Sequence, residues 1–416
     1  MTVRGVCHER VQFPRRVKRT LPTFVVGVSL LGMCTRLAAQ TRLPIAPEPV
    51  GSGARALAQS AFIAVADDAT AASWNPAGLI NLEKPEASFV GVWRTMETEF
   101  SSAALEGDRW SEWEANFASY AQPLQIGNTD VVLSVNYHQA YDLGLEHRNE
   151  NGTVRSRGAI GAYSLACGLS LPSSSHLTIG ASFNWYDRSV CNDYVRQVNK
   201  PASEQIFIET LDSLRGHNFT LGFLWDAYER EENLLTLGLV CHTPFTADVD
   251  GKLVTQSIGG DNQGTTIQPV GPLHIDFPPS LGAGLNYRFS DRFSGAFDVQ
   301  YTDWSKHTYT GATSSPSDIV AYRLGFESLK FSPGGREWVR ALRGGIFYEP
   351  RPAWGDTLPV WGFSLGLGWT VKERFSLDFA YQFRWGDEDN LRVDPATRID
   401  YGIEEHWLIG SVITYF

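Results

Sequence analysis

The sequence predicts an all-β protein: a transmembrane antiparallel β-barrel of about fourteen strands, with a small N-terminal α-rich plug in its lumen. Three observations lead to this prediction. Apolar and polar residues alternate in repeated segments after residue 40, the connections between these segments alternate between short and long, and an Ala-rich stretch precedes the first of them. Charged residues are only 19% of the chain and aromatic residues 12%, which argues against disorder, and the net charge of -11 argues against a nucleic-acid binder.

The alternation has the period of a strand with one apolar and one polar face. In 375–384, for example, Phe375, Phe379 and Phe383 share one face, whereas Asp378 and Arg384 share the other. Most such segments have ten to fifteen residues, and a tilted strand needs about 9–11 residues to cross the hydrocarbon layer. The fourteen segments are 86–98, 113–123, 130–142, 157–171, 175–188, 215–228, 233–243, 280–289, 292–304, 318–328, 338–349, 359–371, 373–386 and 404–416.

The lengths of the connections predict which end of the barrel faces the periplasm and which faces the outside. Every second one is short, such as 172–174 and 290–291, and those between are longer, above all 189–214 and 244–279. Outer-membrane barrels have short periplasmic turns and long external loops. A soluble β-sandwich is the alternative, but its physics does not require every second connection to be short.

The first 39 residues have the features of a secretory signal peptide. A basic region precedes an apolar stretch from Leu21 to Cys34, and the small residues Ala38 and Ala39 follow. A lipoprotein site at Cys34 and twin-arginine export fit less well. Removal of 1–39 would leave a net charge of -17 and three cysteines, Cys167, Cys191 and Cys241, whose odd number rules out a full disulfide framework.

Residues 40–85 differ from the barrel segments and predict a plug. Their Ala-rich stretches indicate short helices, and Asp67 or Asp68 could cap one of them. Asn75 before Pro76 indicates a turn. The predicted domains are therefore a signal peptide (1–39), a plug (40–85) and an outer-membrane barrel (86–416).

The plug segment also carries a resemblance. Asp67-Asp68-Ala69, five residues, then Asn75-Pro76-Ala77 is similar to the plug signature of the FadL/TodX family of outer-membrane transporters of long-chain fatty acids and aromatic hydrocarbons. Two strand segments, 301–305 and 343–349, match more weakly. The resemblance implies a fourteen-stranded barrel in the outer membrane of a Gram-negative-type bacterium. It also implies a ligand captured by the two longest loops, bound in the lumen and released by plug movement through a kink in the third strand.

The resemblance and the strand pattern suggest candidate binding residues. Phe207, Leu211 and Leu214 in the loop 189–214 follow helical spacing and predict a helix that lines the capture groove or packs on the barrel rim. Arg323, Arg343 and Arg384 lie on strands and could bind a ligand carboxylate by charge-assisted hydrogen bonds. The alternative is an ion pair in the lumen with Asp378, Asp298 or Asp67. The third strand, 130–142, contains no Gly or Pro that would mark a kink.

Other functions and partners complete the prediction. The histidines are scattered, with no Gly-x-Ser-x-Gly elbow and no pair at metal spacing, so neither an enzyme nor a metal or other cofactor is predicted. A secretion or surface-attachment platform stays open as the alternative function, and the plug-like segment disfavours a general porin. The expected partners are outer-membrane lipid, a hydrophobic small molecule, and the barrel-assembly machinery, which would read the terminal Phe416.

Overall fold

The described residues of the computed structural model belong to a single compact unit. The described backbone comprises residues 48–49, 51–100, 105–106, 109–142, 145–149, 152–171, 176–187, 192–200, 205–257, 264–309, 315–333, 338–353, 355–372, 374–392 and 398–416. The predicted signal peptide and Cys191 lie outside these residues.

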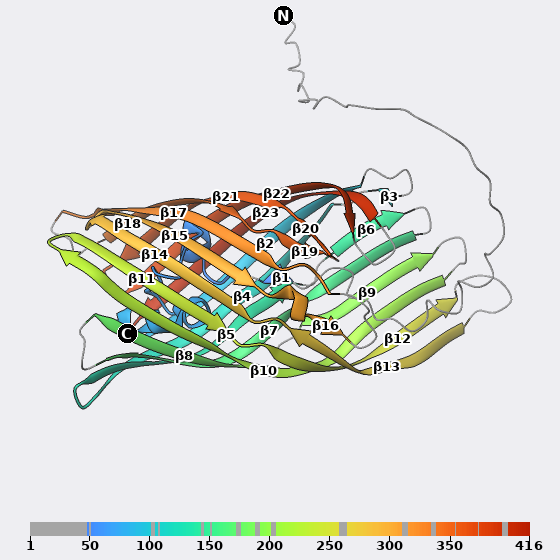
Figure 1. Ribbon diagram of the computed structural model, residues 1–416, viewed down its shortest axis with the longest axis horizontal. Helices are drawn as coiled ribbons and strands as arrows, with labels where there is room; N and C mark the ends of the chain where they lie inside the picture. Colours follow the sequence, from blue (N-terminus) through green and yellow to red (C-terminus); the bar gives the residue numbers. More distant parts are fainter. Residues whose placement is uncertain are drawn as a thin grey trace, which may run out of the picture. The chain divides into compact units, whose positions relative to one another are not determined.

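The fourteen predicted segments form a closed antiparallel barrel, which confirms the fold class (Figure 1). The first strand pairs with the last from Glu86↔Tyr415 to Phe100↔Tyr401, and this pairing closes the sheet. The barrel strands are β2 (Glu86–Phe100), β4 (Arg109–Ile126), β5 (Thr129–Asp142), β7 (Gly152–Ser170), β8 (Leu177–Tyr186), β10 (Gln205–Arg230), β11 (Asn233–His242), β14 (Ser280–Ser290), β15 (Phe293–Thr302), β17 (Ile319–Phe331), β18 (Trp338–Tyr348), β21 (Val360–Val371), β22 (Phe375–Arg392) and β23 (Arg398–Tyr415).

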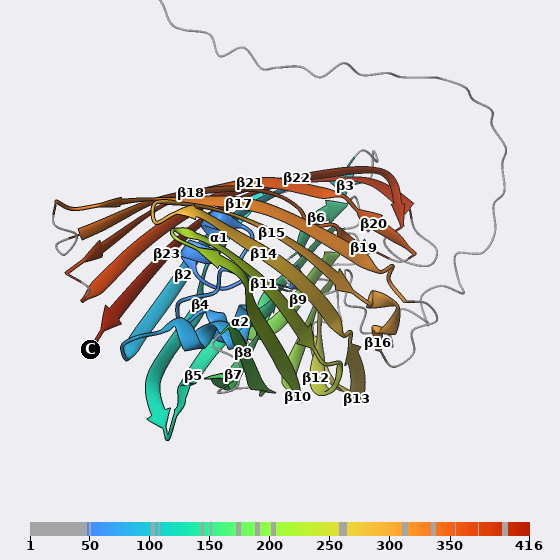
Figure 2. The same cartoon turned by 60° about the vertical axis from the view of Figure 1, so that its left-hand side comes forward.

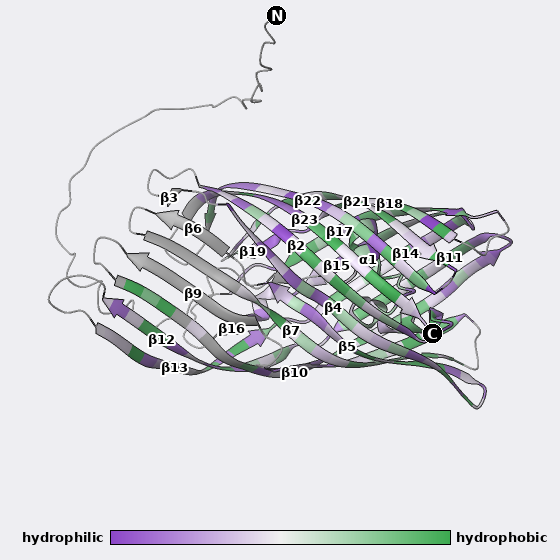
Figure 3. Cartoon of the chain, turned by 180° about the vertical axis from the view of Figure 1, so that it is seen from behind, coloured by the Kyte–Doolittle hydropathy of each residue, from purple (hydrophilic) through white to green (hydrophobic). Residues whose placement is uncertain are grey.

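The two faces of the strands differ as the alternation predicts. On β22, Phe375 and Phe379 are exposed on the outer surface, whereas Asp378 and Arg384 are buried inside. Figure 3 shows the same alternation of hydrophobic and hydrophilic residues along many of the strands. The outward apolar face suits contact with lipid, because hydrocarbon cannot hydrogen-bond to polar side chains.

The two ends of the barrel differ, and we call them the turn end and the loop end. At the turn end, two-residue turns join β10 to β11 and β14 to β15. At the loop end the sheet continues beyond the barrel. The further elements there and nearby are β3 (Leu105–Glu106), β6 (Leu145–Asn149), β9 (Asn192–Lys200), β12 (Phe245–Ser257), β13 (Gly264–Phe277), η3 (Trp304–Lys306), β16 (Thr308–Tyr309), β19 (Arg351–Ala353) and β20 (Asp356–Leu358).

The helix predicted in 189–214 is wrong. β10 runs as one strand from Gln205 to Arg230, and its loop-end half pairs with β9 on one side and with β12 on the other, for example at Phe207↔Val198 and Phe207↔Thr255. Three apolar residues at helical spacing are a weak signal over so short a segment. In this half of β10 the backbone N–H and C=O groups bond to β9 and β12, whereas in a helix they would have bonded to one another.

The third barrel strand, β5, is irregular despite having no Gly or Pro. Its register against β7 shifts between Gln139 and Tyr141, which marks a β-bulge at Ala140. Its pairing with β4 runs only from Ile126↔Thr129 to Phe117↔His138. Beyond that point Tyr141 and Asp142 pair instead with the short strand β1 (Glu48–Pro49). The N-terminal segment therefore enters the sheet beside β5.

The segment after β1 fills the middle of the barrel with three short helices: α1 (Ala54–Gln59), α2 (Ala71–Trp74) and the 3-10 helix η1 (Pro76–Asn81) (Figure 2). Its small apolar side chains pack with inward residues of the strands in one buried cluster. The predicted turn begins η1, where Asn75 Oδ1 accepts the N–H of Ala77. The cap prediction is wrong in detail, because Thr70 precedes α2, and Asp68 accepts the N–H of Thr70 instead.

No helix in the described residues is long and apolar enough to cross a membrane.

Candidate functional site

The plug rests in a seat of glycines. A Cβ on Gly180 or Gly222 would overlap the turn that starts η1, and one on Gly325 or Gly366 would overlap the end of α1. These glycines come from four different strands, β8, β10, β17 and β21, so the close approach extends around the barrel. Only a residue without a side chain lets the plug backbone lie this near the strand backbone. This contact accounts for some of the 39 glycines of the chain.

Side chains of the wall hold the plug by its backbone. Asp298 Oδ2 accepts the N–H groups of Phe62 and Ile63 at 2.6 and 2.9 Å, and Ser411 Oγ accepts that of Ala54 at 2.8 Å. Gln382 donates to the carbonyl of Leu57 at 2.7 Å. Since a plug this short satisfies few of its own backbone groups, the wall supplies the missing partners.

A chain of ion pairs links the plug to three strands. Arg55 of α1 contacts Asp67 at 2.6 Å and Glu327 at 3.2 Å, and Arg343 joins Glu327 at 2.6 Å to Asp378 at 2.5 Å. Burial raises the pKa of the Asp67 carboxyl to about 6, although the neighbouring Arg55 opposes the rise. Burial likewise raises the pKa of Asp68. Both acidic residues of the predicted plug motif therefore lie in an environment that disfavours their charge.

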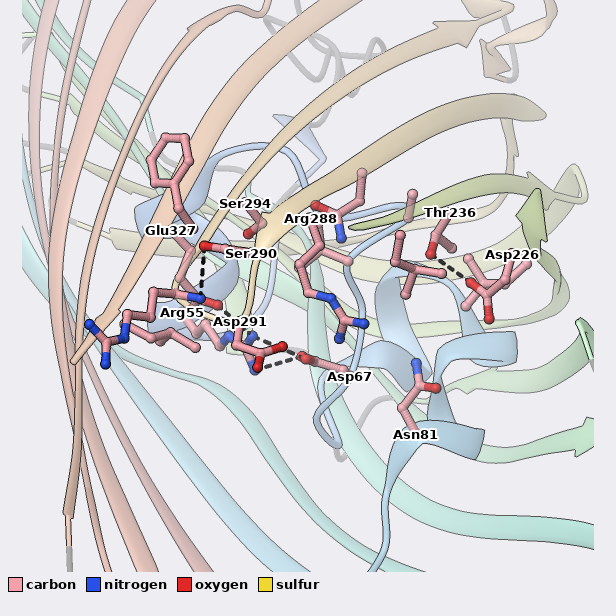
Figure 4. A pocket seen from close by; sticks show the side chains of 18 of the residues that line it. Arg55, Asp67, Asn81, Asp226, Thr236, Arg288, Ser290, Asp291, Ser294 and Glu327 are labelled. Atoms are coloured by element: carbon pink, nitrogen blue, oxygen red, sulfur yellow. Dashed lines mark hydrogen bonds and ion pairs between the residues drawn. The ribbon is translucent and has the colours of Figure 1, made fainter. Parts of the chain in front are cut away.

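The turn side of the plug borders a polar pocket of about 780 Å³ (Figure 4). Arg55, Asp67 and Glu327 line it together with residues of the turns, among them Asp291 and Arg292. A second turn-side pocket of about 260 Å³ shares Arg55 and Asp67 with the first. The charged groups at this end suit contact with water, although apolar side chains also line the larger pocket.

A second buried group of charges spans the interrupted β4–β5 pairing, and we call it the clasp. Arg94 of β2 donates to Glu114 of β4 at 2.9 Å and to both carboxylate oxygens of Asp142 of β5. Gln139, at the bulge, donates to Glu114 at 2.8 Å. The clasp thus connects β4 to β5 through side chains at the level where their backbones no longer pair.

The predicted arginines are all paired. Arg323 contacts Glu349 at 2.5 Å, and Arg384 contacts the other oxygen of Glu349 at 3.0 Å. Arg343 pairs with Asp378, as the alternative prediction allowed. For Arg323 and Arg384 the partner, Glu349, was not among the predicted carboxylates. The lumen arginines are thus engaged in ion pairs in this structure.

On the loop side of the plug the lumen contains a row of aromatic rings within an apolar cluster. Tyr186, Phe245 and Phe277 stack in a row with ring centroids 4.5 Å apart. They belong to a buried cluster, the loop-side cluster, made of Ile160, Ala162, Tyr186, Leu214, Phe245, Ala247, Val249, Ile275 and Phe277. Between it and the plug lies a pocket of about 120 Å³, the loop-side pocket, which is lined by Tyr141 and Tyr186 and by polar side chains of the strands and the plug. Ala140 of the β5 bulge also lines this pocket.

The structure separates the predicted groove residues. Leu214 is buried in the loop-side cluster, and Phe207 is half-buried farther along the extended half of β10. The side chain of Leu211 lies outside the described part, although its backbone belongs to β10. Cys167 and Cys241 are free and half-buried.

Sequence reasoning missed several wall residues that contact the plug. Ser411 shares its strand face with Trp407 and Ile409, so the alternation does not single it out. Asp298 and Gln382 occupy the polar face of strands that the alternation identified. That pattern indicates that they point inward. It does not indicate that they meet the plug, because the register of a segment far away in sequence is needed for that.

A closed barrel with a lipid-facing exterior and an N-terminal plug inside it defines a plugged outer-membrane barrel. The sequence matches the family described as outer membrane protein transport protein (OMPP1/FadL/TodX) over residues 43–403. The chain belongs to this family, and its place is the bacterial outer membrane.

Solved structures share the fold. A Pseudomonas aeruginosa FadL homologue aligns with a TM-score of 0.63 at 15% identity, over 89% of this chain and 99% of its own. The Pseudomonas putida toluene transporter TodX aligns with a TM-score of 0.58 at 14% identity, over 89% and 98%. The Ralstonia pickettii toluene transporter TbuX aligns with a TM-score of 0.58 at 14% identity, over 88% of this chain and 98% of its own. No curated protein matches the sequence.

Proposed function

We propose that the protein carries hydrophobic small molecules, such as long-chain fatty acids, similar lipids or hydrocarbons, across the outer membrane. Ligand is captured at the loop end, enters the apolar lumen above the plug, and is released when the plug moves. The observation that carries the proposal is the loop-side pocket, which touches the loop-side cluster, the plug and the bulged strand β5 at once. Two of the similar structures are toluene transporters by name, which agrees with an apolar cargo.

The apolar cluster in the lumen makes entry of such a molecule favourable in free energy. Burial of apolar surface contributes about 0.8 kcal/mol per CH₂, which a water-filled pore does not supply. The turn-side pockets carry the charges of Arg55 and Asp67, whose desolvation opposes passage of an apolar molecule, so ligand held above the plug has no wholly apolar path straight through it. In the proposed mechanism it leaves sideways, near the place where β4 and β5 stop pairing.

Uptake by cells tests the proposal. Full-length protein is expressed in a Gram-negative host without its own transporter of this kind, and entry of labelled oleate and toluene is measured beside a variant lacking 40–80. We expect uptake with the full chain and altered uptake with the deletion, while both barrels insert in the membrane. Equal uptake in the two strains would contradict release by plug movement. Absence of uptake together with co-purification of a protein partner would favour a secretion platform.

A further inference from the structure

His138 is a buried side chain in the lining of the loop-side pocket, and one of its two ring nitrogens is free. It lies at the last pair that β5 forms with β4, and only 8% of its surface is exposed. Its Nδ1 contacts Asn136 Oδ1 at 3.3 Å and Ser164 Oγ at 3.4 Å. Its Nε2 has no hydrogen-bond partner in the described residues and keeps accessible surface. The pocket therefore contains a ring nitrogen that a ligand can reach.

A chain of hydrogen bonds decides which nitrogen of this ring carries the hydrogen. Asn218 donates to the backbone carbonyl of Thr243 at 3.2 Å, so its amide oxygen faces Asn184 and accepts from it at 2.9 Å. This contact orients the amide of Asn184, whose oxygen accepts the one hydroxyl hydrogen of Ser164 at 2.7 Å. The Ser164 oxygen can then only accept from the His138 ring, so the hydrogen of the ring is on Nδ1.

The free nitrogen of His138 is therefore a hydrogen-bond acceptor. No carboxylate in the described part of the chain contacts the ring, and a buried imidazolium without a counter-ion would be costly, so the ring is neutral. A neutral imidazole with its hydrogen on Nδ1 has a lone pair on Nε2. The second histidine of the lining, His242, differs, because its Nδ1 contacts Ser280 Oγ at 3.0 Å and its ring also hydrogen-bonds to the backbone of Ser73. A ligand that bonds to His138 must supply the hydrogen itself.

The rest of the lining suits an uncharged molecule with a short apolar part. The pocket has a volume of about 120 Å³, and an engineered cavity of about 150 Å³ holds benzene. Trp74, Tyr141 and Val240 supply apolar surface. Arg323 lines the pocket from β17, but its charge is balanced by Glu349 at 2.5 Å. A carboxylate at Nε2 would place its own lone pairs against that of the nitrogen, so an anion is disfavoured there.

We infer that His138 selects the cargo of the loop-side pocket by accepting a hydrogen bond, so that the preferred cargo is an uncharged amphipathic molecule with a hydroxyl or an amide N–H group. The inference rests on the proposed function, because it names the class of molecule that the site takes. A hydrocarbon or an ether would fill the same space and leave Nε2 without a partner. Since His138 stands two residues before the bulge at Ala140, the polar group of the cargo is held beside the place where β4 and β5 stop pairing.

Equilibrium binding of 1-hexanol and of its isomer pentyl methyl ether tests the inference, because the two contain the same atoms and only the alcohol can donate a hydrogen bond. The full-length protein is kept at pH 8 in dodecyldimethylamine oxide, a detergent without a hydrogen-bond donor, and partition into empty micelles is subtracted. We expect the alcohol to bind about tenfold more tightly than the ether. His138→Leu should lower the affinity for the alcohol to that for the ether. The matched control is His217→Leu, on the exposed outer face of β10, and it should keep the wild-type ratio. Equal affinities in the wild type, or an unchanged ratio in His138→Leu, would overturn the inference.

A crystal structure of the wild-type protein with 6-bromo-1-hexanol provides the second measurement and does not depend on the folding of a variant. The anomalous signal of bromine should locate the molecule at the loop-side pocket, with its hydroxyl within hydrogen-bond distance of His138 Nε2. A hydroxyl bonded elsewhere in the lumen counts against the assignment. If alcohol and ether bind equally and cells still take up oleate or toluene, only this inference fails. If no apolar compound is bound or taken up, the proposed function fails with it.

Discussion

Asp298 binds two backbone N–H groups of the plug, and its removal should loosen the stretch of chain around them. The carboxylate is fully buried, and a single oxygen accepts the N–H groups of Phe62 and Ile63. A hydrogen bond to a charged acceptor contributes about 1.5–3 kcal/mol, so two of them give about 3–6 kcal/mol. The lower end is the better expectation, because Asp298→Ala also relieves the burial of a carboxylate. Since about 1.4 kcal/mol corresponds to a tenfold change in an equilibrium constant, the constant for local opening of the plug should rise ~100-fold or more.

Hydrogen exchange by mass spectrometry measures this opening directly. Peptides covering 57–66 should exchange about 100-fold faster in Asp298→Ala, while the ladder between β21 and β22 stays protected. Ser411→Ala is the matched control, since it removes one neutral bond, to the N–H of Ala54, worth about 1 kcal/mol. Exchange at Phe62 and Ile63 within threefold of the wild type would refute the idea that Asp298 anchors the plug. So would an effect no larger than that of the control.

Three further changes test other parts of the lumen. Arg94→Ala leaves two buried carboxylates without their cation and should lower the free energy of unfolding in urea by about 3–5 kcal/mol. A triple variant that combines Arg94→Met with Glu114→Gln and Asp142→Asn should restore most of the lost stability, because no buried charge is then left unpaired. A loss below about 1 kcal/mol in Arg94→Ala would contradict the stabilising role of the clasp. Gly325→Ala should speed hydrogen exchange at the end of α1, because the new Cβ would overlap Gln59. Gly295→Ala is the control and should not change the exchange rate, because the nearest atom to its Cβ is 3.6 Å away. Equal exchange rates in the two variants would argue against the glycine seat. Lowering the pH from 7 to 4 should protonate Asp67, because its folded pKa of about 6 exceeds its ordinary value of 3.8. Between these two values the folded plug binds more protons than the unfolded chain does, so the plug gains stability as the pH falls through 6. Exchange corrected for its intrinsic pH dependence should show this gain, and Asp67→Asn should reduce it; an identical slope in both proteins would refute the assignment.

The strands could be predicted from sequence because their signal is local. Alternation over ten or more residues depends only on which face meets lipid, and every segment found that way is a strand. The inward direction of Asp378 and Arg384 followed from the same periodicity. The plug helices could be expected because small residues and Asn75-Pro76 differ so clearly from the strand pattern.

Contacts between distant segments could not be predicted in the same way. The half of β10 around Phe207 and Leu211 is a strand because β9 and β12 lie on either side of it, and short-range spacing does not reveal these neighbours. Arg323 pairs with Glu349, a residue 26 positions away, because the register of β17 against β18 brings the two together. The bulge in β5 has no Gly or Pro as a marker.

The glycine seat also determines how wide an opened channel would be. Where the plug now rests, several strands present bare backbone to the lumen instead of side chains. If the plug withdraws, the glycines have no side chains of their own to fill the space it leaves. The bore at these positions would then depend on the strand backbones and on whichever side chains of neighbouring strands lie over them, as Asp298 lies over Gly284. The seat thus gives an opened channel its greatest width where the plug now rests.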